Sequence, residues 1–183
     1  MYAHFKEDQP AMSQPSFIDK FSQQFSLEPS RTALLIIDMQ NATGNREMGL
    51  GKLLAEQGNI ESAQYRFDRI ENLLIPNIQR LIAGFRDAGA HIIWITYGAN
   101  AADASDAPRH IAPIIKATNN IAGQPEHEIV DALKPGTGDL VLNKTTQGAF
   151  RSTALDSSLR ALGVDTVVST GVSTNNCVAM TSM

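Results

Sequence analysis

The stretch "TALLIIDMQ" at residues 32–40 decides the fold class, because it joins a continuous apolar run to a polar end. The run from Ala33 to Ile37 contains no polar residue, and Asp38 follows it directly. A strand that is buried on both faces has this pattern, and such strands occur in parallel sheets covered by helices. The stretch therefore predicts a central strand with a carboxylate at its carboxyl end.

Three other segments have the same apolar character and predict three more strands: "HIIWITY" (91–97), "DLVLN" (139–143) and "DTVVST" (165–170). Segments with helical periodicity separate them, and parallel neighbours need crossovers of that length. The sequence thus predicts an α/β fold with three layers (α/β/α) and an open, mainly parallel, Rossmann-like sheet. Residues 98–125 predict a long excursion near one edge of that sheet.

The crossover between the first two strands predicts a long amphipathic helix from Ile60 to Ala88. Its apolar residues fall at helical spacing, with Pro76 expected to kink or break the helix and Gly89 to end it. Residues 152–163 predict a second helix, which Ser152 caps and Gly163 ends.

Length and composition predict one main domain at residues 31–183, preceded by a polar, proline-containing arm at residues 1–30. The 183 residues are 43% hydrophobic and 19% charged, which suffices for one core. A net charge of -4 without a basic cluster argues against a nucleic-acid partner, and no apolar run has the length to span a membrane. A single cysteine and no targeting signal favour a cytoplasmic location.

Three chemically reactive side chains lie close to the carboxyl ends of the predicted strands: Asp38, Lys144 and Cys177. Parallel strands bring those ends to one edge of the sheet, where open α/β folds bind ligands. Lys144 and a helix start at Cys177 would favour the thiolate, and Asp38 would accept the thiol proton. Each residue alone also has an ordinary structural interpretation, so the prediction of a catalytic cysteine depends on all three together.

Three motifs occur in one order along the chain: "LLIIDMQN" (34–41), "DLVLNKTTQGAF" (139–150) and "TGVSTNNCV" (170–178). In these motifs the sequence resembles the isochorismatase-like cysteine hydrolases, in particular their amidohydrolase branch, from about residue 31 to the last residue. The resemblance implies a catalytic triad of Asp38, Lys144 and Cys177. It also implies a cis peptide bond before Ser173 and an oxyanion hole formed by the backbone amides of Ser173 and Cys177.

The resemblance further implies that Phe150 lines the substrate pocket and that Asn176, Gln40 and Tyr97 contact the substrate. The family fold continues beyond residue 183, so the domain is expected to lack its C-terminal part. Family members form dimers or tetramers, and we expect a homo-oligomer here. The Asp-x-His metal element of nicotinamidases is missing. We therefore expect no metal and no other cofactor. We interpret Asp103, Asp106 and His110 as ordinary polar residues of a loop and not as metal ligands.

The sequence therefore predicts a hydrolase that cleaves a C–N bond of a small amide or carbamoyl compound. The reaction would proceed through a thioester on Cys177 and release ammonia or an amine. The alternative is a non-catalytic or truncated subunit of the same fold that serves binding or assembly. The reactivity of the thiol distinguishes the two hypotheses.

Overall fold

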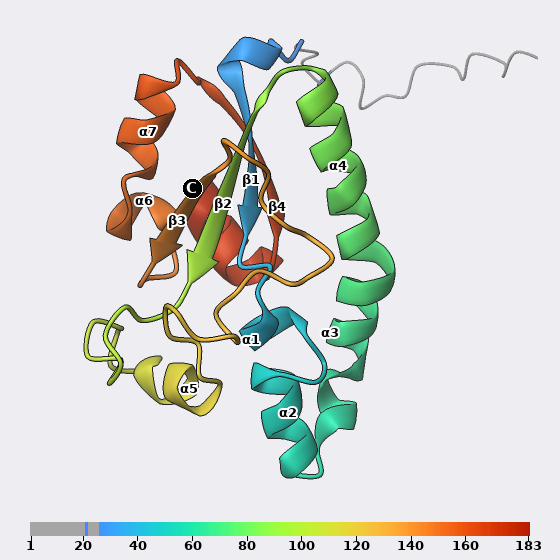
Figure 1. The fold of residues 1–183 in the computed structure, drawn as a ribbon, viewed down its shortest axis with the longest axis vertical. Coiled ribbons are helices and arrows are strands. Elements are labelled where there is room, and N and C mark those ends of the chain that lie inside the picture. Colours follow the sequence, from blue (N-terminus) through green and yellow to red (C-terminus); the bar gives the residue numbers. More distant parts are fainter. Residues whose placement is uncertain (1–20, 22–25) are drawn as a thin grey trace, which may run out of the picture.

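The computed structural model describes residue 21 and residues 26–183 of the chain (Figure 1). Most of the predicted arm lies outside the described residues. Its last residues form a 3-10 turn, η2 (Pro29–Arg31), directly before the first strand. The boundary between arm and domain stays a prediction.

The described residues form one parallel sheet of four strands in the order β3-β2-β1-β4. The strands are β1 (Thr32–Ile37), β2 (His91–Tyr97), β3 (Leu140–Lys144) and β4 (Thr166–Gly171). The predicted α/β class with a parallel sheet and helices is confirmed. β3 and β4 each begin and end one residue later than predicted, so Lys144 is the last residue of β3 rather than the residue after it.

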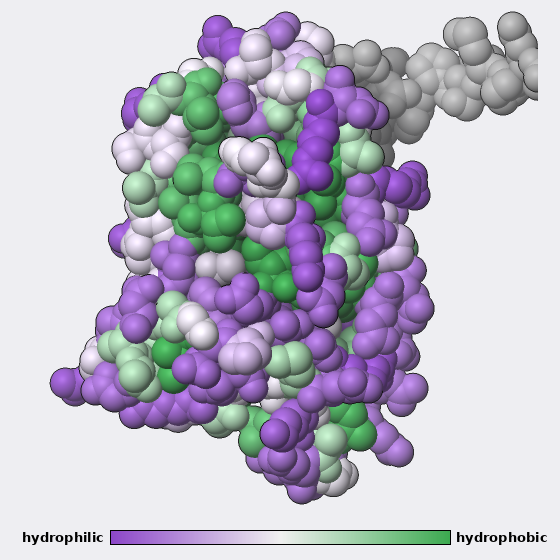
Figure 2. Space-filling view, in the orientation of Figure 1, coloured by the Kyte–Doolittle hydropathy of each residue, from purple (hydrophilic) through white to green (hydrophobic). Residues whose placement is uncertain are grey.

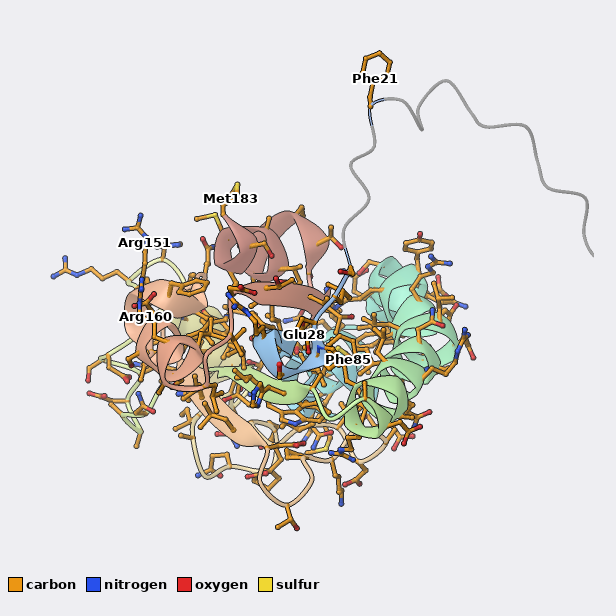
Figure 3. All side chains as sticks on the ribbon, turned by 90° about the horizontal axis from the view of Figure 1, so that it is seen from above. Phe21, Glu28, Phe85, Arg151, Arg160 and Met183 are labelled. Carbon is orange, nitrogen blue, oxygen red and sulfur yellow. The ribbon has the colours of Figure 1, made fainter. Side chains whose placement is uncertain are left out.

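The two faces of the sheet carry separate apolar cores, as the alternation of side chains along a strand requires. From β1, Leu34 and Ile36 pack with Ile78 and Ile82 of α4 (Ile75–Asp87). Leu35 and other alternate residues pack on the opposite face against α6 (Ala149–Ser152) and α7 (Leu155–Ala161). Figure 3 shows α4 on one side of the sheet, with Arg151 of α6 and Arg160 of α7 pointing away on the other.

The crossover predicted as one helix from Ile60 to Ala88 is a helical run in four segments. These are η3 (Ile60–Ala63), α3 (Gln64–Arg69), the π-helical turn η4 (Ile70–Leu74) and α4. In the π turn the N–H of Ile75 bonds to the carbonyl of Ile70, five residues back. Pro76 has no N–H to donate, so the helical pattern is already altered in the turn before it. Gly89 ends the run with a positive φ of 72°.

The second predicted helix begins later than expected, and the prediction that Ser152 caps it is wrong. Ser152 is the last residue of α6, and its hydroxyl lies 2.9 Å from the Thr146 hydroxyl. The N–H of Leu155, the first residue of α7, donates to Thr153 Oγ1 instead. Gly163 follows α7 with a φ of 70°, which agrees with its predicted role as terminator.

Short helices and loops cover the carboxyl ends of the strands: α1 (Asn41–Gly44), α2 (Gly49–Glu56), α5 (Ala112–Ala117), η5 (Thr174–Val178) and α8 (Ala179–Ser182). The predicted excursion contains α5 and a small apolar cluster of its own around Ala99, Ala104 and Ile115. Figure 2 shows that the lower part of the molecule, with α2 and α5, is largely hydrophilic. Among the described residues no helix has the length and hydropathy needed to cross a membrane.

Candidate active site

Asp38 is the residue directly after β1, and it has a backbone conformation that few side chains adopt. Its φ is 56°, in the left-handed region, where aspartate is one of the better tolerated residues. Its N–H donates to the carbonyl of Ile95 at 2.8 Å, and its carbonyl accepts the Thr43 hydroxyl at 3.0 Å. These bonds hold the end of β1 against β2 and fix where the carboxylate lies.

Lys144 at the end of β3 donates to this carboxylate, with Nζ 2.9 Å from Asp38 Oδ2. The lysine side chain is 0% exposed and the aspartate side chain 4%. The ammonium also lies 4.1 Å from the centre of the Tyr97 ring, a cation–π contact. A lysine this deeply buried requires a charged partner. The Lys144–Asp38 pair is therefore a buried ion pair and not a solvent-exposed one.

Cys177 follows β4 and Lys144 ends β3, so the two residues approach the Asp38 carboxyl from either side of β1. Cys177 is part of the helical turn η5 that follows β4, is 6% exposed, and packs with the core on the α6 and α7 face. The thiol and the Asp38 carboxyl are close enough for each to shift the pKa of the other, and Lys144 acts on the pKa of both. The three residues predicted from the sequence therefore meet at one place.

Burial dominates the protonation of this site. Desolvation raises the pKa of the Cys177 thiol to about 12, with the Asp38 charge adding to the rise and Lys144 opposing it. Desolvation also raises the pKa of Asp38, against the lowering effects of Lys144 and of the Cys177 hydrogen bond. Lys144 favours the thiolate, as expected, but burial and the Asp38 charge outweigh it, so the thiol of the resting site keeps its proton.

Two buried polar atoms next to the triad have no hydrogen-bond partner of ordinary geometry in the described part of the chain: Asp38 Oδ1 and the Tyr97 hydroxyl. Burial, and then the charges of Cys177 and Asp38, raise the pKa of Tyr97. Buried polar groups are rarely left without a partner except at functional sites. The Tyr97 hydroxyl is available to a bound molecule, and Asp38 Oδ1 is available to accept a proton.

The turn between β4 and Cys177 has a constrained backbone. Gly171 has a φ of 119°, and a Cβ at this position would lie 2.0 Å from the carbonyl oxygen of Ile37. The peptide bond between Val172 and Ser173 is cis, as the resemblance implies. The Val172 N–H donates to the Ile37 carbonyl at 3.0 Å, whereas the Ser173 N–H donates to no described residue.

Comparison with known proteins agrees with this geometry. The model of the isochorismatase domain family matches residues 32–183. The chain belongs to the isochorismatase family.

Its relatives include the ureidoacrylate amidohydrolases RutB of Variovorax paradoxus and Methylobacterium radiotolerans. The first is 30% identical over 94% of this chain and 69% of its own length. The second is 31% identical over 85% of this chain and 62% of its own length. This chain thus spans about two thirds of the length of these relatives.

Solved structures of the family have the same fold. A cysteine hydrolase from Pseudomonas syringae pv. phaseolicola is 26% identical with a TM-score of 0.67, covering 93% of this chain and 70% of its own. An isochorismatase family protein from Desulfovibrio vulgaris is 32% identical with a TM-score of 0.65, covering 82% and 72% of the two chains. The family resemblance inferred from the three motifs is confirmed.

The four predicted substrate contacts lie in different environments within this isochorismatase domain. Tyr97 lies beside the triad, as described above, while Phe150 is 44% exposed and Asn176 is exposed. Gln40 is 0% exposed, and its amide bonds only to protein. It donates to the His127 carbonyl at 2.7 Å and accepts the Tyr97 N–H at 2.7 Å. Gln40 is therefore placed to hold the Tyr97 segment, and its contact with substrate stays a prediction.

The acidic residues of the excursion stabilise the loop backbone. Asp106 accepts the N–H groups of Asn100 and Ala101, and Asp103 accepts the N–H of Ser105. In residues 26–183 no three His, Cys, Asp or Glu side chains are grouped in a way that could hold a metal ion.

Arg66 is a residue near the site that the sequence did not single out. It extends from α3 and donates from Nη1 to the Ser173 hydroxyl at 2.9 Å, and it is affected by the charges of Cys177 and Asp38. In the sequence it is one of several charged residues on the polar side of an amphipathic pattern. Only the fold shows that this part of α3 lies against the turn before Cys177.

Proposed function

We propose that this chain is a cysteine hydrolase that cleaves a C–N bond of a small amide or ureido compound and releases ammonia or an amine. The observation that carries the proposal is the buried contact between the Lys144–Asp38 pair and the Cys177 thiol. The amidohydrolase names of the RutB relatives support the same reaction class, and a small ureido acid is the first substrate to consider.

The reaction begins with transfer of the thiol proton to Asp38 as the sulfur attacks the carbonyl carbon of the substrate. A buried carboxylate with a raised pKa suits this role, because burial makes it a stronger base than aspartate in water. Proton transfer leaves the total charge of the site unchanged, and Lys144 remains in contact with the carboxyl group. The nucleophile is thus formed only when substrate is present to react.

The tetrahedral intermediate places a negative charge on the former carbonyl oxygen. The backbone N–H groups of Ser173 and Cys177 would bind this oxyanion, and the Ser173 N–H is without a described acceptor in the structure. As the C–N bond breaks, Asp38 returns the proton to the departing nitrogen, and Cys177 retains the acyl group as a thioester or the carbamoyl group as a thiocarbamate. Water, deprotonated by Asp38, then releases the acid and restores the thiol.

Tyr97 supports substrate binding in this proposal, because its buried hydroxyl has no described protein partner. It can donate a hydrogen bond to a polar group of the substrate next to the triad. Phe150 and Asn176 stay predictions as pocket residues. The cytoplasmic location and a homo-oligomer, dimer or tetramer, also stay predictions.

The test is ammonia release from a panel of small amides: 3-ureidoacrylate, 3-ureidopropionate, biuret, carbamoylated amino acids and aromatic amides. The substitution Cys177→Ala should lower the release from the best substrate by at least about a thousandfold, since one missing member disables such a unit. Ser157→Ala, an exposed change on α7, is the control and should have no effect. Equal activity of Cys177→Ala would contradict the proposal, and a protein inert toward the whole panel would favour the non-catalytic alternative.

A further inference from the structure

Arg66 is a half-buried cation with only neutral partners. Its Nε and Nη2 donate to the carbonyl of Thr43 at 3.2 and 3.1 Å, and its Nη1 donates to the Ser173 hydroxyl. The acidic residues of the same helical run, Asp68 and Glu71, pair with Arg46 instead, at 2.7 and 3.0 Å. Within the described part of the chain Arg66 forms no salt bridge.

An unpaired guanidinium in this environment has a free-energy cost that a bound anion would offset. Burial lowers the pKa of Arg66, but arginine remains protonated at any physiological pH. The charges of Cys177 and Asp38 also act on it, which places the guanidinium close to the reacting groups. A charge is removed from water at low cost only where a charge of opposite sign compensates it.

A cavity with a volume of about 330 Å³ lies at this point, between the α3–η4 run and the turn at residues 171–174. Arg66 and Arg69 line it together with Tyr65 and four apolar side chains, and no acidic residue contributes. Its lining therefore carries positive charge only, and the turn that forms its other wall includes Ser173.

We propose that this cavity binds a carboxylate group of the substrate and that Arg66 is its principal contact. The inference rests on the proposed function and narrows the substrate to an amide or ureido acid. Ser173 would bind the oxyanion through its N–H, and its hydroxyl contacts Arg66 at 2.9 Å. The carboxylate and the scissile carbonyl of the substrate are therefore only a few bonds apart.

The donor geometry of Arg66 fits this ligand. A guanidinium has five N–H donors. One on Nε, one on Nη1 and one on Nη2 are used by Thr43 and Ser173. One N–H on each terminal nitrogen remains for a bound anion, and a guanidinium is the side chain best suited to a carboxylate.

The experiment compares a carboxylate substrate with its neutral counterpart, 3-ureidopropionate with its methyl ester, in the wild type and in Arg66→Gln. The wild type should prefer the acid. Arg66→Gln should raise KM for the acid by about tenfold to a hundredfold, the range expected for charge-assisted hydrogen bonds, and change KM for the ester by less than about threefold. Arg80→Gln, an exposed arginine of α4, is the matched control for loss of one positive charge.

A merely positioning role for Arg66, through the Ser173 hydroxyl, would lower kcat for both substrates equally and leave the preference for the acid intact. That result would overturn the inference, as would a wild type that prefers the ester.

Calorimetric titration of Cys177→Ala with 3-ureidopropionate tests binding without turnover. Binding that the additional change Arg66→Gln abolishes supports the cavity as a carboxylate site even if the chain cleaves no amide. Equal binding in the single and double variants overturns the inference while leaving the proposed function standing.

Discussion

Asp38 combines three unusual properties: a left-handed backbone conformation, near-complete burial and a raised pKa. The backbone conformation turns the chain sharply at the end of β1, and the N–H and carbonyl of the residue are both bonded to protein. The carboxyl group is thereby held between an ammonium and a thiol. These properties suit a group that accepts a proton and returns it within one turnover.

The substitution Asp38→Asn should separate thiol acidity from catalysis. The Asp38 charge raises the pKa of Cys177 and the Lys144 charge lowers it, so the variant should have a thiol pKa below that of the wild type. Amide hydrolysis should nevertheless fall by about 10²–10⁴-fold, because the proton acceptor is lost. Thiolate ultraviolet absorbance as a function of pH measures the first effect and ammonia release the second.

A thiol pKa that is unchanged or higher in Asp38→Asn would show that the carboxylate does not act on the sulfur. Retained hydrolysis would show that another group accepts the proton.

At the scale of elements, the end of β4 and the turn after it depend on Gly171. The residue combines a positive φ with a close approach to the backbone of Ile37, so no side chain fits without moving β1 or β4. This contact sets how the turn at residues 172–174 leaves β4 next to the end of β1.

Gly171→Ala should therefore lower both stability and activity. The expected loss of unfolding free energy is at least about 1–3 kcal/mol, the range for a forced backbone conformation, and chemical denaturation measures it. Gly84→Ala in α4 is the matched control. A Cβ there meets nothing within 4 Å, so alanine should be neutral or stabilising by up to about 1 kcal/mol. A Gly171→Ala protein as stable as the control would contradict this account of the turn.

The sequence could predict the strands because a buried parallel strand is a continuous apolar run, and Ala33 to Ile37 is such a run. It could predict the triad because the parallel topology brings Asp38 and Lys144 to one edge. The exact start of α7 was not predictable, because Ser152 and Thr153 are both good caps by residue type, whereas the N-cap position is occupied by Ala154 and Ser152 contacts Thr146.

The sequence could not predict how deeply the Cys177 thiol is buried, or the effect of that burial on its pKa. The nearby ammonium of Lys144 alone predicts an acidic thiol, and the packing of Cys177 against the core, together with the Asp38 charge, reverses that prediction. The bonds of the Gln40 amide to the His127 carbonyl and the Tyr97 N–H were equally beyond sequence reasoning. Side-chain partners more than fifty residues apart leave no local pattern.

At the scale of the whole molecule, the Lys144–Asp38 pair links two strands that are not neighbours, β1 and β3, across the end of β2. Removal of one partner leaves a buried charge without compensation, which typically costs about 3–5 kcal/mol. The pair thus ties the catalytic geometry to the stability of the sheet.

Lys144→Met should destabilise the protein by about that amount near neutral pH, and less in acid. Loss of the ammonium removes a group that lowers the pKa of Asp38, so the folded-state pKa rises further above the unfolded value. The folded variant then holds a proton that the unfolded chain releases, and its stability falls as pH rises through that interval. Urea unfolding between about pH 5 and about pH 8 measures the trend.

The double variant Asp38→Asn with Lys144→Met is the control for that trend. It leaves no ionisable group in the pair, so it should recover part of the lost stability and lose the additional pH dependence. A single variant whose stability relative to the wild type is the same at both pH values would contradict the assignment of a coupled, buried pair.

The most direct measurement of the central claim is the intact mass of the protein during turnover of 3-ureidoacrylate or of the best substrate in the panel, after rapid acid quenching. We expect the mass of the wild type to increase by that of the acyl or carbamoyl group, on the peptide that contains Cys177. We expect no such increase in Cys177→Ala or in Asp38→Asn. Turnover of substrate with no adduct on Cys177, or the same adduct in the Asp38→Asn protein at the wild-type rate, would contradict that claim.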